Sequence, residues 1–461
     1  MAHRPVAFRL IAVLVALAAL PADAQTRISR EEGRAFAAQL LTDGQPAAAA
    51  EVLRALIQAD PEDVIALVLM SRSARAQGDG ERARDFARQA WAAAETPEHR
   101  FAAAVVRAQA HATDTPGPLS VWWMRRALQI APDEAARDFA RTEAAALRRA
   151  APLSVTLSFG LAPRSNINNG GANELYDLHP AVADLLRAYF GNPNLRPQGT
   201  LREGERPLSG LELNGGLTLR YRLSETRDSL TNLTFRVTGR TYRLSDEAKA
   251  DSPGVSGSDF SDTVLSFGLS HRWVAESGTF GLDIEAGRIF YGGEPHSDIA
   301  RATLGHSWAL DEAVLTLDAT LAGTRFADPE DDPSREIGLG LRYTRPVDLG
   351  RLDLGLTVTD VASDTPDRAY LGVGLEAGLR FLDGAADVTL GLEHRSYDET
   401  RYIAETREDW IGTLSASYAV TEWETFGFQP VLTLNARRLW SNAERPETRS
   451  LGAGLTFRSS F

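Results

Sequence analysis

The fold is decided by the C-terminal stretch LGAGLTFRSSF, residues 451–461. Its apolar residues stand at every second position, at Leu451, Ala453, Leu455 and Phe457, and the stretch closes on Phe461. A strand whose side chains alternate in this way meets lipid on one face and a polar lumen on the other. The pattern, with an aromatic residue at its end, is typical of a bacterial outer-membrane β-barrel.

Thirteen earlier segments from Leu153 onward repeat the same two-residue period, and most are long enough for a tilted strand to cross a bilayer. Tight turns such as Asp311-Glu312 alternate with longer polar connections such as residues 397–405. Short periplasmic turns and long outer loops produce that rhythm. We therefore predict a 14-stranded antiparallel outer-membrane β-barrel over residues 152–461. Aromatic residues near strand ends, Tyr242 and Trp273 among them, are expected at the lipid headgroups.

A helical region precedes the barrel. Gly44 and Gly78 are 34 residues apart and each is followed by alanines, while Pro61, Pro97 and Pro132 are spaced by 36 and 35 residues. This period resembles tetratricopeptide repeats, in which helix pairs bury their apolar faces by stacking on one another. We predict a helical solenoid over residues 25–151, which would lie in the periplasm because it precedes the first strand.

The N-terminus has the features of an export signal. Residues 1–24 combine positive residues, the apolar run Leu10–Leu20 and the small-residue cleavage site Ala22-Asp23-Ala24. Cleavage would leave Gln25 at the new N-terminus. Because the chain has no cysteine, it is neither a lipoprotein nor a disulfide-bonded or thiolate-binding protein.

The negative charge is concentrated in the barrel region. Residues 25–150 carry 17 basic and 17 acidic residues, whereas residues 151–461 carry 30 basic and 44 acidic ones. This balance argues against nucleic acid as a partner. The eight histidines form no metal-binding spacing and no nucleophile motif stands out, so we expect no enzyme activity, no metal and no cofactor.

The first outer loop, residues 162–209, is far longer than an ordinary hairpin connection. It begins with an asparagine-rich motif and contains an amphipathic helix near residues 180–190. Such a loop either folds into the barrel as a plug or stands outside it. The pore or plug candidates are Asn166, Ile167, Asn168 and Asn169, although asparagines at these positions also favour simple turn formation.

The run SFGLAPRSNINN, residues 158–169, resembles the surface lipoprotein assembly modulator (Slam) family, the outer-membrane proteins of type XI secretion. The order of a helical repeat region and a fourteen-strand barrel is similar as well. The resemblance implies a translocator that helps surface lipoproteins or related secreted proteins to cross the outer membrane. It implies that the solenoid engages cargo or a chaperone, by residues that the sequence does not identify.

Two other functions fit the same organisation: an exopolysaccharide-export porin, and a passive porin with a periplasmic docking domain. The expected partners are a protein cargo, outer-membrane lipids and the barrel assembly machinery, which would recognise Phe461. The chain is expected to act as a monomer in the outer membrane, with its N-terminal domain in the periplasm.

Overall fold

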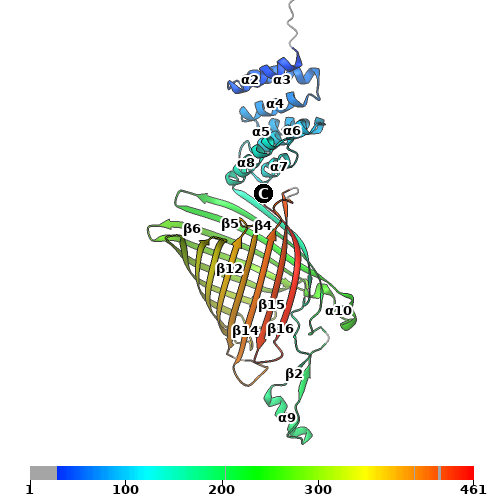
Figure 1. Ribbon diagram of the computed structural model, residues 1–461, viewed down its shortest axis with the longest axis vertical. Helices are drawn as coiled ribbons and strands as arrows, with labels where there is room; N and C mark the ends of the chain where they lie inside the picture. Colours follow the sequence, from blue (N-terminus) through cyan, green and yellow to red (C-terminus); the bar gives the residue numbers. More distant parts are fainter. Residues whose placement is uncertain (1–28, 203, 399, 424–426, 461) are drawn as a thin grey trace, which may run out of the picture. The chain divides into compact units, whose positions relative to one another are not determined.

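The computed structural model describes residues 29–202, 204–398, 400–423 and 427–460 (Figure 1). The predicted signal peptide and Phe461 lie outside the described residues. The helical part contains α2 (Arg30–Thr42), α3 (Pro46–Ala59), α4 (Val64–Ala76), α5 (Gly80–Ala93), α6 (Pro97–His111), α7 (Pro118–Gln129) and α8 (Glu134–Ala150). None of the described helices is long and apolar enough to span a bilayer.

Small side chains let the helices α2–α6 approach closely. Ala49, Ala66 and Ala83 are fully buried, with Leu53 and Leu67 among them. Three of these helices begin at a side-chain cap: Ser29 forms a capping box with Glu32 at α2, and Asp63 and Asp79 accept hydrogen bonds from the first turns of α4 and α5. The predicted array of short helices is therefore confirmed.

The boundary between the two structural units differs from the predicted one at residues 151–152. The first unit comprises the described residues up to Asp114 together with Ile130–Arg137, and the second comprises Thr115–Gln129 together with everything from Asp138 onward. α7 therefore belongs with the barrel, which it contacts at the first strand. The change of hydrophobic period in the sequence shows where helices give way to strands. It does not show where the residue contacts separate the chain into two units.

Fourteen strands form one closed antiparallel barrel, as predicted. They are β1 (Leu153–Arg164), β4 (Gly210–Glu225), β5 (Ser229–Leu244), β6 (Asp262–Ala275), β7 (Gly278–Tyr291), β8 (Glu294–Leu310), β9 (Ala313–Phe326), β10 (Ser334–Val347), β11 (Gly350–Ala362), β12 (Tyr370–Phe381), β13 (Ala386–Tyr397), β14 (Arg407–Ala419), β15 (Phe428–Ser441) and β16 (Thr448–Ser460). Each strand pairs with its neighbour in sequence, and β1 closes the barrel by pairing with β16, so that Phe159 lies opposite Phe457.

Apolar side chains cover the outside of the barrel. Phe267, Leu321 and Leu375 are each more than half exposed, and all have polar neighbours on the opposite face. In a soluble protein such a surface would aggregate, whereas a bilayer accommodates it. Tyr242 does not lie on the lipid-facing side as expected. It pairs with Glu212, and because cross-strand partners lie on the same side of a sheet, both side chains lie on the inner face.

The connections at the two ends of the barrel differ in length. At one end, here called the turn end, the links include residues 226–228, 276–277 and 311–312. At the other, the loop end, the links include residues 245–261 and 398–406, but Gly292-Gly293 is a two-residue hairpin there. This hairpin departs from the predicted alternation of short and long connections, because two left-handed glycines suit a tight turn. The turn-end link of residues 420–427 departs from it as well, since it is longer than the loop-end link of residues 442–447.

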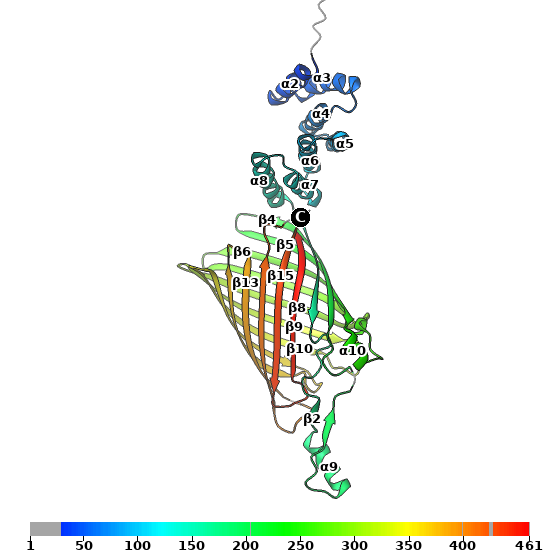
Figure 2. The same ribbon diagram turned by 45° about the vertical axis from the view of Figure 1, so that its right-hand side comes forward.

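The first loop stands outside the barrel. β1 extends through Arg164, so the connection is shorter than the predicted 162–209 and covers residues 165–209. It carries β2 (Leu175–Asp177), the predicted helix α9 (Pro180–Phe190) and β3 (Gln198–Thr200). Both views show these elements beyond the strand ends, away from the lumen (Figures 1 and 2). We call residues 172–202 the arm.

Candidate functional site: the barrel lumen

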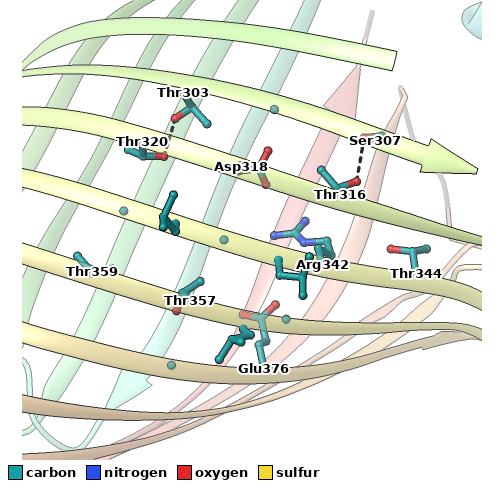
Figure 3. Close-up of a pocket in the computed structure, with 18 of the residues that line it drawn as sticks. Thr303, Ser307, Thr316, Asp318, Thr320, Arg342, Thr344, Thr357, Thr359 and Glu376 are labelled. Atoms are coloured by element: carbon teal, nitrogen blue, oxygen red, sulfur yellow. Dashed lines mark hydrogen bonds between the residues drawn. The ribbon is translucent and has the colours of Figure 1, made fainter. Parts of the chain in front are cut away.

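The lumen contains a cavity of about 940 Å³. Its wall is built on β6–β14, where glycine, threonine and serine occupy most of the inward positions (Figure 3). Several hydroxyls bond to one another across neighbouring strands: Thr303 to Thr320 at 2.9 Å, and Ser307 to Thr316 at 2.8 Å. Because these side chains are short and lie along the wall, they leave the lumen wide and polar.

Most charged side chains in the cavity form ion pairs along the wall. A nitrogen of Arg272 lies 2.6 Å from a carboxylate oxygen of Asp283, and the corresponding distance from Arg351 to Asp353 is 3.0 Å. Arg301 and Glu336 form a looser pair at 3.5 Å. Pairing of this kind neutralises the wall locally and reduces its attraction for passing ions.

Three cavity residues have no oppositely charged group within 4 Å among the described residues: Asp318, Arg342 and Glu376. They come from β9, β10 and β12 and point into the same space (Figure 3). Glycines flank them. A Cβ added at Gly305 would lie 2.4 Å from Oδ1 of Asp318, so the glycine makes room for that carboxylate. These three residues are the groups best placed to meet a solute.

Arginine and tyrosine side chains interleave at the loop end of the lumen. Arg407 lies 4.2 Å above the ring of Tyr397 and forms an ion pair with Asp409, whose side chain is fully buried. Arg395 lies 4.5 Å from the ring centre of Tyr370. Because the faces of these rings are already covered by guanidinium groups, they are poor platforms for stacking sugars.

The predicted pore or plug candidates do not line the cavity; they lie at the base of the first loop. Nδ2 of Asn166 donates to the carbonyls of Gly170 and Arg449, at 2.9 and 3.1 Å. Ile167 is buried against Leu208, Leu244 and Ala248.

The other two asparagines of the motif have different structural roles. Nδ2 of Asn168 donates to the carbonyls of Gly204 and Arg206, and its Oδ1 accepts from the backbone N–H of Leu208. Asn169 is exposed and has a left-handed backbone with φ of 53°. The motif therefore fastens the loop to the rim, and its side chains are occupied by backbone groups.

The sequence alone does not identify the charged groups of the lumen. Alternation showed which positions face inward, but it did not show which charged residues pair across strands, because pairing depends on register. The described residues contain no group of three or more histidines and carboxylates that could hold a metal ion.

A closed fourteen-strand barrel with an apolar exterior and a polar lumen defines the class of transmembrane outer-membrane β-barrels. No family model and no curated protein matches the chain.

Several solved structures of outer-membrane proteins are similar to this chain, with low sequence identities and low TM-scores. OccAB1 of Acinetobacter baumannii has 7% sequence identity and a TM-score of 0.38, over 67% of this chain and 96% of that one. The outer-membrane protein OpdK of Pseudomonas aeruginosa has 10% identity and a TM-score of 0.34, over 67% and 99%. A BenF-like porin from Pseudomonas fluorescens Pf-5 has 8% identity and a TM-score of 0.34, over 67% and 98%. These likenesses do not assign the chain to a family.

Proposed function

We propose that the protein is an outer-membrane channel for polar solutes, with its N-terminal helices serving as a periplasmic docking domain. The observation that carries this proposal is the lumen itself: a cavity of about 940 Å³ with short polar side chains, while the arm stands beyond the strand ends. Short turns normally face the periplasm and longer loops the cell surface. The helices precede β1 at the turn end, which places them on the periplasmic side in this proposal.

The test uses the full-length protein in planar lipid bilayers, where an open lumen gives stepwise ion conductance. The chain has no cysteine, so single cysteines can be introduced without background. Thr357→Cys places a thiol on the cavity wall, and Val358→Cys places one on the adjacent outward position. A charged thiol reagent is expected to lower conductance through the first variant and to leave the second unchanged. A protein that inserts but carries no current would contradict the proposal.

Protein export is the second candidate function. It is supported by the array of helices on the same chain and by an arm that is fixed to the rim at both of its ends. Ala172 N–H donates to the carbonyl of Glu447 at 2.7 Å, and Glu205, just after the arm, pairs with Arg445 at 3.2 Å. In this reading the helices receive a lipoprotein or a related secreted protein, and the lumen passes it in an extended form. The partners would then be that cargo, the surrounding lipids and the barrel assembly machinery.

Surface exposure of lipoproteins separates the two functions. Intact cells with and without the protein are treated with a protease, and the cleavage of outer-membrane lipoproteins is compared. Loss of cleavage of a particular lipoprotein in cells that lack the protein would favour export. Unchanged cleavage, together with conductance of the purified channel, would favour the solute channel alone.

A further inference from the structure

The unpaired charges of the lumen are separated by sign between two halves of the wall. β14–β16, β1 and β4–β6 form one half, and β7–β13 form the other. On the first half, ion pairs neutralise three inward carboxylates: Glu212 with Arg164 and Asp262 with Arg240, both at 2.9 Å, and Asp409 with Arg407.

Three inward arginines of the first half have no described carboxylate within 4 Å: Arg220 on β4, Arg437 on β15 and Arg458 on β16. Cross-strand register places each of them on the inner face. Arg220 lies opposite Ser154, Arg437 opposite the cavity residue Thr413, and Arg458 opposite Ser158. This half therefore carries a net positive charge from its unpaired groups, and we call it the basic wall.

The second half carries the unpaired carboxylates Asp318 and Glu376, with Arg342 between them on β10. Its other carboxylates in the cavity, Asp283, Glu336 and Glu393, pair with arginines. The balance of its unpaired groups is therefore negative, and we call this half the acidic wall.

The two walls face each other. In the closed order of fourteen strands, β16 is seven strands from β9, and β4 is seven strands from β11, which lies between β10 and β12. Arg220, Asp318 and Glu376 lie at matching positions along their strands, each five residues from the turn end, and Arg458 lies two residues from it. Opposite charges are thus held apart across the lumen instead of neutralising one another.

We propose that the lumen is selective for small zwitterions, such as amino acids. A solute with an ammonium group and a carboxylate would align with its ammonium group toward Asp318 and Glu376 and its carboxylate toward Arg220 and Arg458. Charged walls of this kind raise the local concentration of complementary groups, and the effect falls with ionic strength. The proposal rests on the channel function and adds to it the class of solute.

The test compares three variants with the wild type in bilayers and in liposomes. Asp318→Asn with Glu376→Gln removes the two unpaired carboxylates of the acidic wall, Arg220→Gln with Arg458→Gln removes two of the three unpaired arginines of the basic wall, and the third variant carries all four changes. Reversal potentials in a KCl gradient report the ratio of cation to anion permeability. Swelling of liposomes reports the entry of β-alanine, a zwitterion, relative to erythritol, which is neutral.

The acidic-wall variant is expected to shift permeability toward anions, and the basic-wall variant toward cations, each by about twofold or more. The fourfold variant is expected to restore the ion ratio but to lose the preference for β-alanine. A control, Glu276→Gln with Asp383→Asn, removes two charges from the tight turns and is expected to change neither ratio. A channel that conducts, but whose variants behave like this control, would overturn the zwitterion proposal while the channel function stands. A barrel that carries no current would overturn both.

Discussion

At the scale of single residues, the asparagines of the first loop show how a motif can be visible in the sequence while its purpose is not. Residues 166–169 were recognisable as a cluster, yet the structure assigns them different tasks. Asn166 and Asn168 bond to backbone groups, whereas Asn169 supplies a left-handed turn. The sequence could not separate these tasks, because they depend on segments such as 204–208 and Arg449 that are distant in the chain.

Replacement of Asn168 by alanine is expected to loosen the loop while the barrel stays folded. Three backbone groups would lose their partner, and each hydrogen bond contributes about 0.5–1.5 kcal/mol. The measurement is limited trypsin digestion of the protein in detergent, followed at Arg187 and Arg202, because Arg196 and Arg206 precede prolines, where trypsin does not cleave. Cleavage there is expected to be several times faster than in the wild type.

Asn169→Gly serves as the matched control, because Asn169 is exposed and glycine accepts its left-handed backbone. If Asn168→Ala and Asn169→Gly were cleaved at the same rate as the wild type, the fastening role of Asn168 would be refuted.

At the scale of elements, the sequence predicts where α8 ends, but it does not predict what caps its C-terminus. Pro152 predicted the end of the helix, and α8 does end at Ala150. The structure adds a cap: Nη2 of Arg222 on β4 donates to the carbonyls of Arg149, Ala150 and Ala151 at 3.0, 3.0 and 3.2 Å. These carbonyls have no partner within the helix, and a positive charge also suits the helix C-terminus.

Arg222→Gln is expected to fray the last turn of α8. The lost hydrogen bonds and charge amount to about 1–2 kcal/mol, enough to expose Arg148 and Arg149 to trypsin. Faster cleavage at these two sites, detected by mass spectrometry of the digested protein, would show the effect. Arg227→Gln, in the turn after β4, removes the same charge without touching α8. Equal cleavage in both variants would rule out the cap.

At the scale of the whole molecule, the fold class and the number of strands followed from the sequence, since alternation with a period of two is a local property. The sequence predicts a helical region followed by a barrel, and the division of contacts places α7 with the barrel. α7 has the amphipathic pattern of the other helices, yet Nη1 of Arg125 donates to the carbonyl of Gly427 at 3.4 Å. The sequence also does not predict the charge distribution of the lumen. That distribution depends on which side chains of neighbouring strands form ion pairs.

Removal of residues 29–114 is expected to leave a folded, conducting barrel, because these residues lie in the first unit. Removal of residues 29–150 is expected to lower the yield of folded barrel, since it also takes away α7 and the capped end of α8. The measurements are the amount of protein in the outer-membrane fraction and the single-channel conductance of each form. Equal yield of the two truncated forms would show that α7 is dispensable for the barrel.

The pairing of the first and last strands has a consequence for biogenesis. β1 is synthesised first, but its partner β16 is synthesised last, and Phe159 cannot meet Phe457 until then. At roughly 5–20 residues per second, the interval is on the order of 15–60 seconds. Throughout it, one edge of β1 offers unsatisfied backbone groups to any neighbouring chain. The nascent polypeptide therefore depends on being kept apart from its siblings until its final strand has been delivered.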